Sequence, residues 1–85
     1  MNNIVMRKIV LTAAYQALTA KDVEVASVEV STPPGNTGPA YFKGDDGSDV
    51  PWIAGEFHSF QRVNLAVLLV KGTPGDVVTV VGGSW

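Results

Sequence analysis

Short alternations of apolar and polar positions run along the chain, and groups of turn residues separate them. In residues 5–12, Ile9 and Leu11 fall on one face of an extended segment, and Lys8 and Val10 fall on the other. A period of two is typical of a β-strand. We therefore expect the first strand at residues 5–12.

Residues 23–30 carry the clearest alternation. Val23 and Val25 set one phase, whereas Val28 and Val30 set the opposite one, which indicates a bulge or a break between two pairings at Ala26-Ser27. Three further short strands are predicted at residues 40–43, 50–53 and 57–62, and a loop or a single helical turn is predicted at residues 13–20.

The last third of the chain is more apolar than the rest. Residues 65–70 and 77–81 are almost unbroken apolar runs, and the sequence Thr73-Pro74-Gly75-Asp76 between them favours a type II turn. This pattern predicts a terminal hairpin. Strands that are apolar on both faces need cover on both, so we expect a second protein surface to cover the outer face of this hairpin.

Turn signals recur about every 8–12 residues, and no helical period extends over a useful length. These features predict an all-β protein with about seven to eight short antiparallel strands, arranged as a small β-sandwich or a jelly-roll-like barrel. With 85 residues, the chain has room for one domain, residues 1–85.

Composition narrows the function further. The chain has no cysteine, a formal net charge of -2, and 16% charged against 46% hydrophobic residues. The few basic residues are scattered, which disfavours electrostatic capture of nucleic acid or of an anionic membrane. No run approaches the roughly 18 apolar residues of a membrane span, and no signal peptide is expected because Tyr15 and Gln16 interrupt the early apolar run. High apolarity in so small a chain suits a protein that is buried among partners.

Candidate chemistry is sparse. His58 is the only histidine, and neither Ser48 nor Ser59 stands at a spacing that supports a catalytic triad. Residues 45–49 with Glu56 resemble a calcium loop only superficially, because the sixth position, which needs glycine, holds Val50. We therefore expect no catalytic residues, no metal and no cofactor.

Aromatic residues offer an alternative. Tyr41, Trp52 and Trp85 could form a stacking platform for sugar rings, although core packing explains Tyr41 more simply. Trp52 and Trp85 are harder to bury in a small core and are better candidates for contact with a partner. Together with Val78 and Val80 of the expected hairpin, they form our predicted assembly interface.

The order of these pieces resembles a group of small all-β proteins common among the virion genes of tailed phages. The resemblance extends across most of the chain, and its most recognisable part is the Gly-Asn-Thr-Gly sequence before an aromatic strand. The matching segments are residues 11–18, 28–30, 34–42, 54–56 and 64–65. The Pro33-Pro34 pair and the terminal Trp85 depart from the usual pattern, which leaves head, neck and tail locations open.

The resemblance implies a non-enzymatic virion structural protein, of the capsid decoration (cement) type. Such proteins are typically symmetric oligomers attached to a shell or tail, so the expected partners are further copies, as a dimer or trimer, and the major capsid or other virion proteins. The protein would be made in the host cytoplasm and end up in the virion. The alternative is a carbohydrate- or receptor-binding module of a head fibre or tail, marked by an exposed shelf of Trp52 and Tyr41. An enzyme would need His58 beside an acid and a nucleophile in a cleft.

Overall fold

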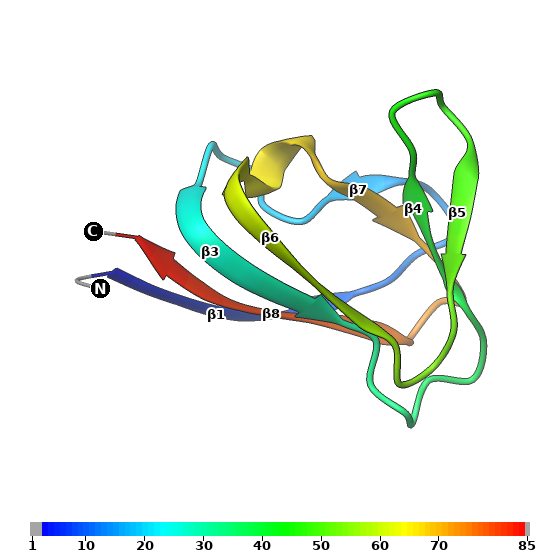
Figure 1. The fold of residues 1–85 in the computed structure, drawn as a ribbon. Helices are drawn as coiled ribbons and strands as arrows, with labels where there is room; N and C mark the ends of the chain where they lie inside the picture. The colour runs from blue at the N-terminus through cyan, green and yellow to red at the C-terminus, as the bar shows by residue number, and fades with distance from the viewer. Residues whose placement is uncertain (1–2, 85) are drawn as a thin grey trace.

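The computed structural model describes residues 3–84, which form two four-stranded antiparallel sheets (Figure 1). In chain order the elements are β1 (Asn3–Val10), β2 (Gln16–Ala17), β3 (Glu24–Ser31), β4 (Ala40–Lys43), β5 (Asp49–Trp52), β6 (Phe57–Asn64), the 3-10 helix η1 (Leu65–Val67), β7 (Leu69–Lys71) and β8 (Val77–Ser84). One sheet has the order β1-β8-β3-β6, and the other has the order β2-β7-β4-β5. The all-β prediction is confirmed, in its sandwich form.

The predicted terminal hairpin is wrong. The turn itself forms as expected, since Gly75 has φ 95° and the Asp76 N–H donates to the Thr73 carbonyl at 3.0 Å. However, β7 pairs with β2 and β4, whereas β8 pairs with β1 and β3, so the turn carries the chain from one sheet to the other. The two apolar runs therefore face each other across the core instead of lying side by side.

The predicted break in the alternation of β3 is confirmed. The β3–β6 register does not shift, so no residue is inserted: Val25↔Val63 and Ser27↔Gln61 share one register, and only the pair between them is missing, where Arg62 has a left-handed φ of 54°. Both Val25 and Val28 are buried, although an uninterrupted strand would place an odd and an even residue on opposite faces. The break thus lets both ends of β3 contribute to the core.

The core lies between the inner faces of the two sheets. Trp52 of β5 stacks on Phe42 of β4 with ring centroids 3.8 Å apart, and Phe60 of β6 lies parallel to Trp52 at 6.4 Å. The buried hydrophobic residues are Leu11, Leu18, Val25, Val28, Val30, Ala40, Phe42, Trp52, Leu65, Val70, Val78 and Val80. In the sheet β1-β8-β3-β6, the two central strands β8 and β3 contribute fully buried valines to this core.

The hairpin between β4 and β5 follows its sequence closely. Gly47 has φ 85° and donates its N–H to the Gly44 carbonyl at 3.0 Å, as the Asp-Gly signal predicts. Pro51 lies on β5, the edge strand of its sheet, where a missing backbone donor is tolerated.

The proline-rich loop of residues 33–39 is fixed to the start of β8. The Asn36 side chain donates to the Val77 carbonyl at 2.8 Å and accepts from the Val77 N–H at 3.0 Å, so it replaces a neighbouring strand. The Asp76 carboxylate accepts from the backbone N–H groups of Thr37 and Gly38 at 3.0 and 3.1 Å. Two side chains thus hold a loop that has no regular structure of its own.

These contacts predict a pH-dependent stability. The hydrogen bond from the Thr37 backbone, followed by that from Gly38, lowers the pKa of Asp76 below its ordinary value, although burial opposes the shift. A carboxyl with a lowered folded-state pKa contributes stability that is complete above its unfolded pKa of about 3.9 and is lost as pH falls through the folded pKa. Asp76→Asn should therefore have a lower urea midpoint than the unmodified protein at pH 7. At pH 3 the two midpoints should lie closer together. Asp45→Asn, in the exposed turn, controls for the loss of one charge, and an equal midpoint shift in both variants would contradict the role of Asp76.

Candidate protein interface

The outward face of the sheet β1-β8-β3-β6 carries an apolar surface. Residues directly opposite each other in an antiparallel pair share a face of the sheet. The register of β1 and β8 places Met6 opposite Val81 and Val10 opposite Val77, with Ile4 further along the same face. Alternation along β1 therefore collects Ile4, Met6 and Val10 on one side.

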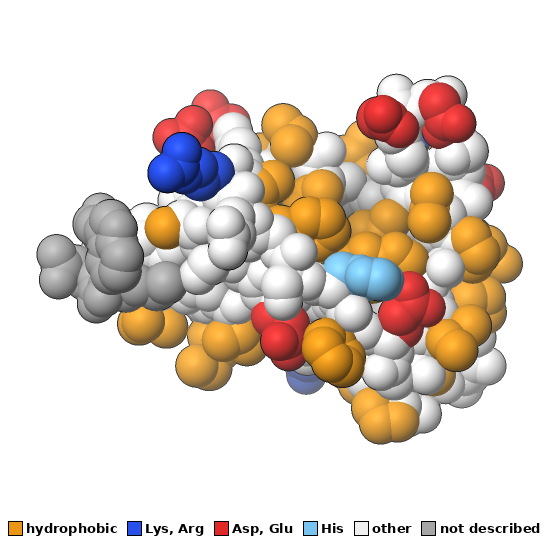
Figure 2. All heavy atoms as spheres, viewed as in Figure 1, with side chains coloured by type: hydrophobic (Ala, Val, Ile, Leu, Met, Phe, Trp, Pro, Cys, Tyr) orange, Lys and Arg blue, Asp and Glu red, His pale blue; other side chains and the backbone are white. Residues whose placement is uncertain are grey.

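Four of these side chains are largely exposed to solvent. Ile4, Met6, Val10 and Val81 are between 48% and 72% exposed, and we call them the outer apolar patch. Figure 2 shows hydrophobic side chains along the lower left margin, below the strands labelled β1 and β8 in Figure 1. Val81 also borders a shallow hollow of about 230 Å³ on the same face, next to Glu29 and Gln61. Contiguous exposed apolar side chains on one sheet face are typical of a protein interface.

The predicted interface residues lie elsewhere. Val78 and Val80 are fully buried because alternation along β8 turns them toward the core, and Trp52 is buried in the aromatic stack. These three side chains are unavailable to a partner in this structure, which corrects the prediction. Trp85 lies outside the described residues.

The outer apolar patch could have been found in part from the sequence. The prediction that Lys8 and Val10 share a face of the first strand, opposite Ile9 and Leu11, is confirmed by the burial of Leu11 and the exposure of Val10. Extending that alternation toward the N-terminus assigns Ile4 and Met6 to the face of Val10. The pairing of β1 with β8, which adds Val81, has no local signal.

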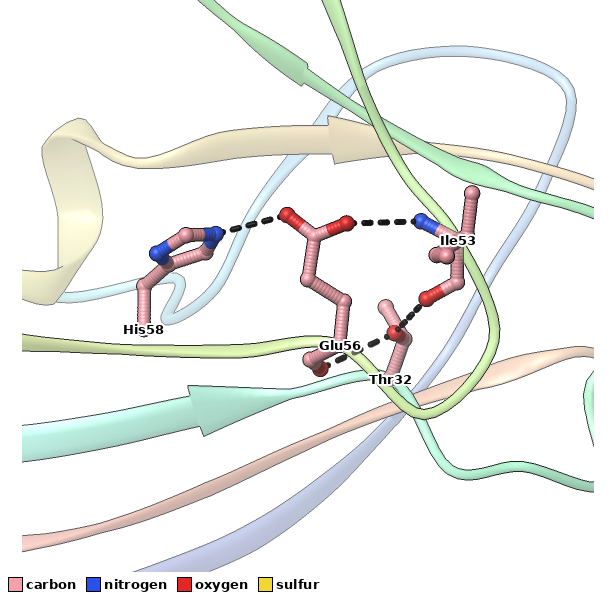
Figure 3. A network of polar contacts seen from close by, with 4 residues as sticks. All are labelled: Thr32, Ile53, Glu56 and His58. Atoms are coloured by element: carbon pink, nitrogen blue, oxygen red, sulfur yellow. Dashed lines mark hydrogen bonds and ion pairs between the residues drawn. The ribbon is translucent and has the colours of Figure 1, made fainter.

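A network of polar contacts runs from His58, at the start of β6, through Glu56 and Ile53 to Thr32 (Figure 3). The His58 ring nitrogen Nε2 lies 2.6 Å from the Glu56 carboxylate, whose other oxygen accepts from the Ile53 N–H at 3.1 Å. The buried Thr32 hydroxyl donates to the Ile53 carbonyl at 2.6 Å. The hydrogen bond with His58 lowers the pKa of Glu56. Together these contacts close the turn between β5 and β6.

The same geometry separates His58 from the serines considered as nucleophiles. Ser59 follows His58 on β6 and pairs with Glu29, so it lies on the opposite, outward face of the sheet. Ser48 lies in the β4–β5 turn, where its hydroxyl donates to Asp46 at 2.6 Å and lowers the pKa of that carboxyl. The arrangement does not assemble a histidine, an acid and a nucleophile.

A second charged cluster lies on the sheet β2-β7-β4-β5. The Tyr15 hydroxyl donates to the Asp49 carboxylate, and Lys71 lies 3.3 Å from that carboxylate and 4.7 Å from the Tyr15 ring centroid. The hydrogen bond to Asp49 raises the pKa of Tyr15 to about 12. The same bond, followed by the one from Lys71, lowers the pKa of Asp49. These residues tie the segment before β2 to β5 and β7.

The structure gives little support to a sugar-binding shelf. Trp52 packs inside the sandwich, with its ring between Phe42 and Phe60, and Tyr41 is half-buried beside Pro51 on the neighbouring strand. The two aromatic rings therefore do not form an exposed platform.

Residues 3–84 give no assignment from a metal site or a membrane span, and known proteins give none for the chain. In this range, no three histidine or acidic side chains come together in a way that could hold a metal ion. No helix within the same range has the length and apolarity to cross a membrane. No family model, curated protein or solved structure matches the chain.

Proposed function

We propose that this protein is a non-enzymatic structural protein that assembles onto other protein subunits through the outer apolar patch. In its specific form, the proposal is a decoration protein that oligomerises and binds the capsid shell of a tailed phage. The observation that carries it is the exposure of Ile4, Met6, Val10 and Val81 on one sheet face. The phage context rests on the sequence resemblance alone.

The energetics of the patch favour a protein partner. Full burial of a valine or methionine side chain contributes roughly 1.5–3 kcal/mol, part of which offsets the loss of translational and rotational freedom on association. One patch therefore gives modest binding, and repetition over a symmetric particle strengthens it through multivalency. Lys8 lies between Met6 and Val10 on the same face, so it adds a polar contact within the patch.

Co-sedimentation with purified shells of the encoding phage, stripped of this protein, tests the proposal. We expect the unmodified protein to bind, and Val81→Lys to bind at least about tenfold more weakly because a charge replaces a methyl group that the contact would bury. Val67→Lys is the matched control, since Val67 is an equally apolar, exposed side chain on η1.

Two results would contradict the proposal. If the unmodified protein stays in the supernatant with the shells at saturating concentration, the capsid role is wrong. If Val67→Lys reduces binding as much as Val81→Lys, the outer apolar patch is not the contact surface.

A further inference from the structure

Strand β1 is an edge strand with an open backbone along much of its length. Within residues 3–84 it pairs only with β8, through eight successive residue pairs from Asn3↔Ser84 to Val10↔Val77. Just past its end, the Leu11 N–H donates to the Asp76 carbonyl at 2.8 Å, toward the β8 side. Backbone groups alternate between the two sides of a strand, so the even-numbered residues direct their N–H and C=O groups to the free edge.

One end of this free edge is already occupied. The Gln16 side-chain amide donates to the Val10 carbonyl at 2.7 Å. Among residues 3–10, those with both backbone groups open at this edge are therefore Ile4, Met6 and Lys8, a stretch centred on Met6. Neither a proline nor a bulge interrupts β1, although natural edge strands often use such features to prevent pairing.

We propose that the occupant of this edge is β1 of a second copy of the chain, paired antiparallel about a two-fold axis at Met6. Met6 then faces Met6 of the second copy, Ile4 faces Lys8, and Val5 faces Arg7. The three even-numbered pairs are hydrogen-bonded pairs, each of which exchanges two backbone bonds. This inference rests on the proposed function, because it identifies one of the protein partners as a second copy of the chain, bound at the strand that carries most of the outer apolar patch.

Charge and backbone occupancy select this register. An axis at Arg7 would place two arginines directly opposite each other, and an axis at Lys8 would do the same with two lysines, which destabilises a sheet. The axis at Arg7 would also set Ile4 against Val10, whose carbonyl is bonded to Gln16. Registers with an axis between two residues would pair outward with inward side chains. An axis at Val5 avoids both conflicts but pairs only residues 3–7 of the described strand, whereas the axis at Met6 pairs residues 3–9 and forms one more hydrogen-bonded pair.

The pairing would also enlarge the outer apolar patch. A two-fold axis perpendicular to the sheet keeps the outward faces of both copies on the same side. Two four-stranded sheets then become one eight-stranded sheet, in which the two Met6 side chains lie directly opposite each other and each Ile4 lies diagonal to the Met6 of the other copy. The dimer would therefore present two patches to a shell at once, with the gain in avidity that two linked contacts give.

Single-cysteine crosslinking tests the register, because the chain contains no cysteine of its own. Under mild oxidation we expect Met6→Cys to form a disulfide-linked dimer, since opposite Cα atoms in a hydrogen-bonded pair are about 5.5 Å apart. Lys8→Cys should remain uncrosslinked, because two such residues would be offset by about 13 Å along the strands. Faster crosslinking of Arg7→Cys or Lys8→Cys than of Met6→Cys would overturn the register.

Analytical ultracentrifugation of the full chain tests the dimer itself. The unmodified protein should sediment as a dimer, and Met6→Pro should sediment as a monomer because proline removes an N–H from the free edge. The Met6 N–H is directed away from β8, so the variant should keep its far-UV circular dichroism. A monomer at every concentration, or a Met6→Pro variant that still dimerises, would overturn the proposal. If Met6→Pro fails to fold, the crosslinking of the cysteine variants still shows whether two copies pair at Met6.

The two proposals fail separately. Crosslinking and sedimentation contain no capsid, so a monomer that binds shells through Val81 refutes only the dimer. A Met6-linked dimer that ignores shells refutes only the capsid role.

Discussion

Replacing Gly82 with alanine is expected to lower the free energy of unfolding by about 3 kcal/mol, at the upper end of the usual cost of overpacking. Gly82 lies in β8 between β1 and β3, opposite Val5 and Val28. A Cβ atom at this position would lie 2.8 Å from the Val28 Cα and closer still to the Ser27 carbonyl oxygen. Because these atoms belong to the backbone of β3, a rotamer change cannot relieve the clash. The variant must open the β3–β8 ladder, which joins the two halves of the sheet.

Urea denaturation at pH 7 measures this effect, and Gly35→Ala is its matched control. Gly35 lies in the proline-rich loop, where an added Cβ would meet nothing within 4 Å and φ is not positive. Its replacement should leave the free energy of unfolding unchanged or raise it by about 0.4–1 kcal/mol, because alanine restricts the unfolded chain. Similar urea midpoints for Gly82→Ala and the unmodified protein would show that β8 does not approach β3 as closely as described.

Leu65→Ala should cost about 2–5 kcal/mol, the range for deleting a buried leucine side chain. Leu65 begins η1 and is 0% exposed, in the core between the two sheets. Its backbone is held in place as well, since its N–H donates to the Val23 carbonyl at 2.9 Å and the Asn64 side chain caps the helix. The surroundings therefore cannot collapse easily into the space that the variant leaves. In a domain whose total stability is about 5–15 kcal/mol, this loss is a large fraction.

Val67→Ala separates burial from helix formation. Val67 ends the same 3-10 helix but is 66% exposed, so its replacement should change the free energy of unfolding by less than about 0.5 kcal/mol. Thermal and urea unfolding of both variants would check the contrast. If the two replacements cost the same, η1 contributes through its backbone and the core does not depend on Leu65.

Local features of the fold could be predicted because local chemistry determines them. Pro74-Gly75 fits only a few turn geometries, Asp46-Gly47 favours a tight hairpin, and the change of phase between Val25 and Val28 requires a break in β3. The structure shows each of these. Alternation also assigned Val10 and Leu11 to opposite faces of the first strand, with the correct outcome.

The pairing of strands could not be predicted in the same way. A type II turn fixes four residues, but it does not determine whether the flanking strands pair with each other or enter different sheets. Here β8 pairs with β1, more than sixty residues away in sequence, and this long-range choice decides that Val78 and Val80 are core while Val81 is surface. The predicted interface was misplaced for this reason. Apolar residues on both faces of β8 do require two covers, but the protein's own second sheet supplies the cover for Val78 and Val80.

The antiparallel pairing of β1 with β8 also sets how the molecule would respond to tension. Asn3 and Ser84 are opposite each other at one end of the ladder, and the pairs continue from there to Val10 and Val77 (Figure 1). A force that draws Asn3 and Ser84 apart therefore loads the backbone hydrogen bonds one pair at a time, like a zipper, and does not shear all of them together. Anchoring through the broad outward face of the sheet would instead distribute a mechanical load over many contacts, which makes that face a stronger point of attachment than the two strand ends.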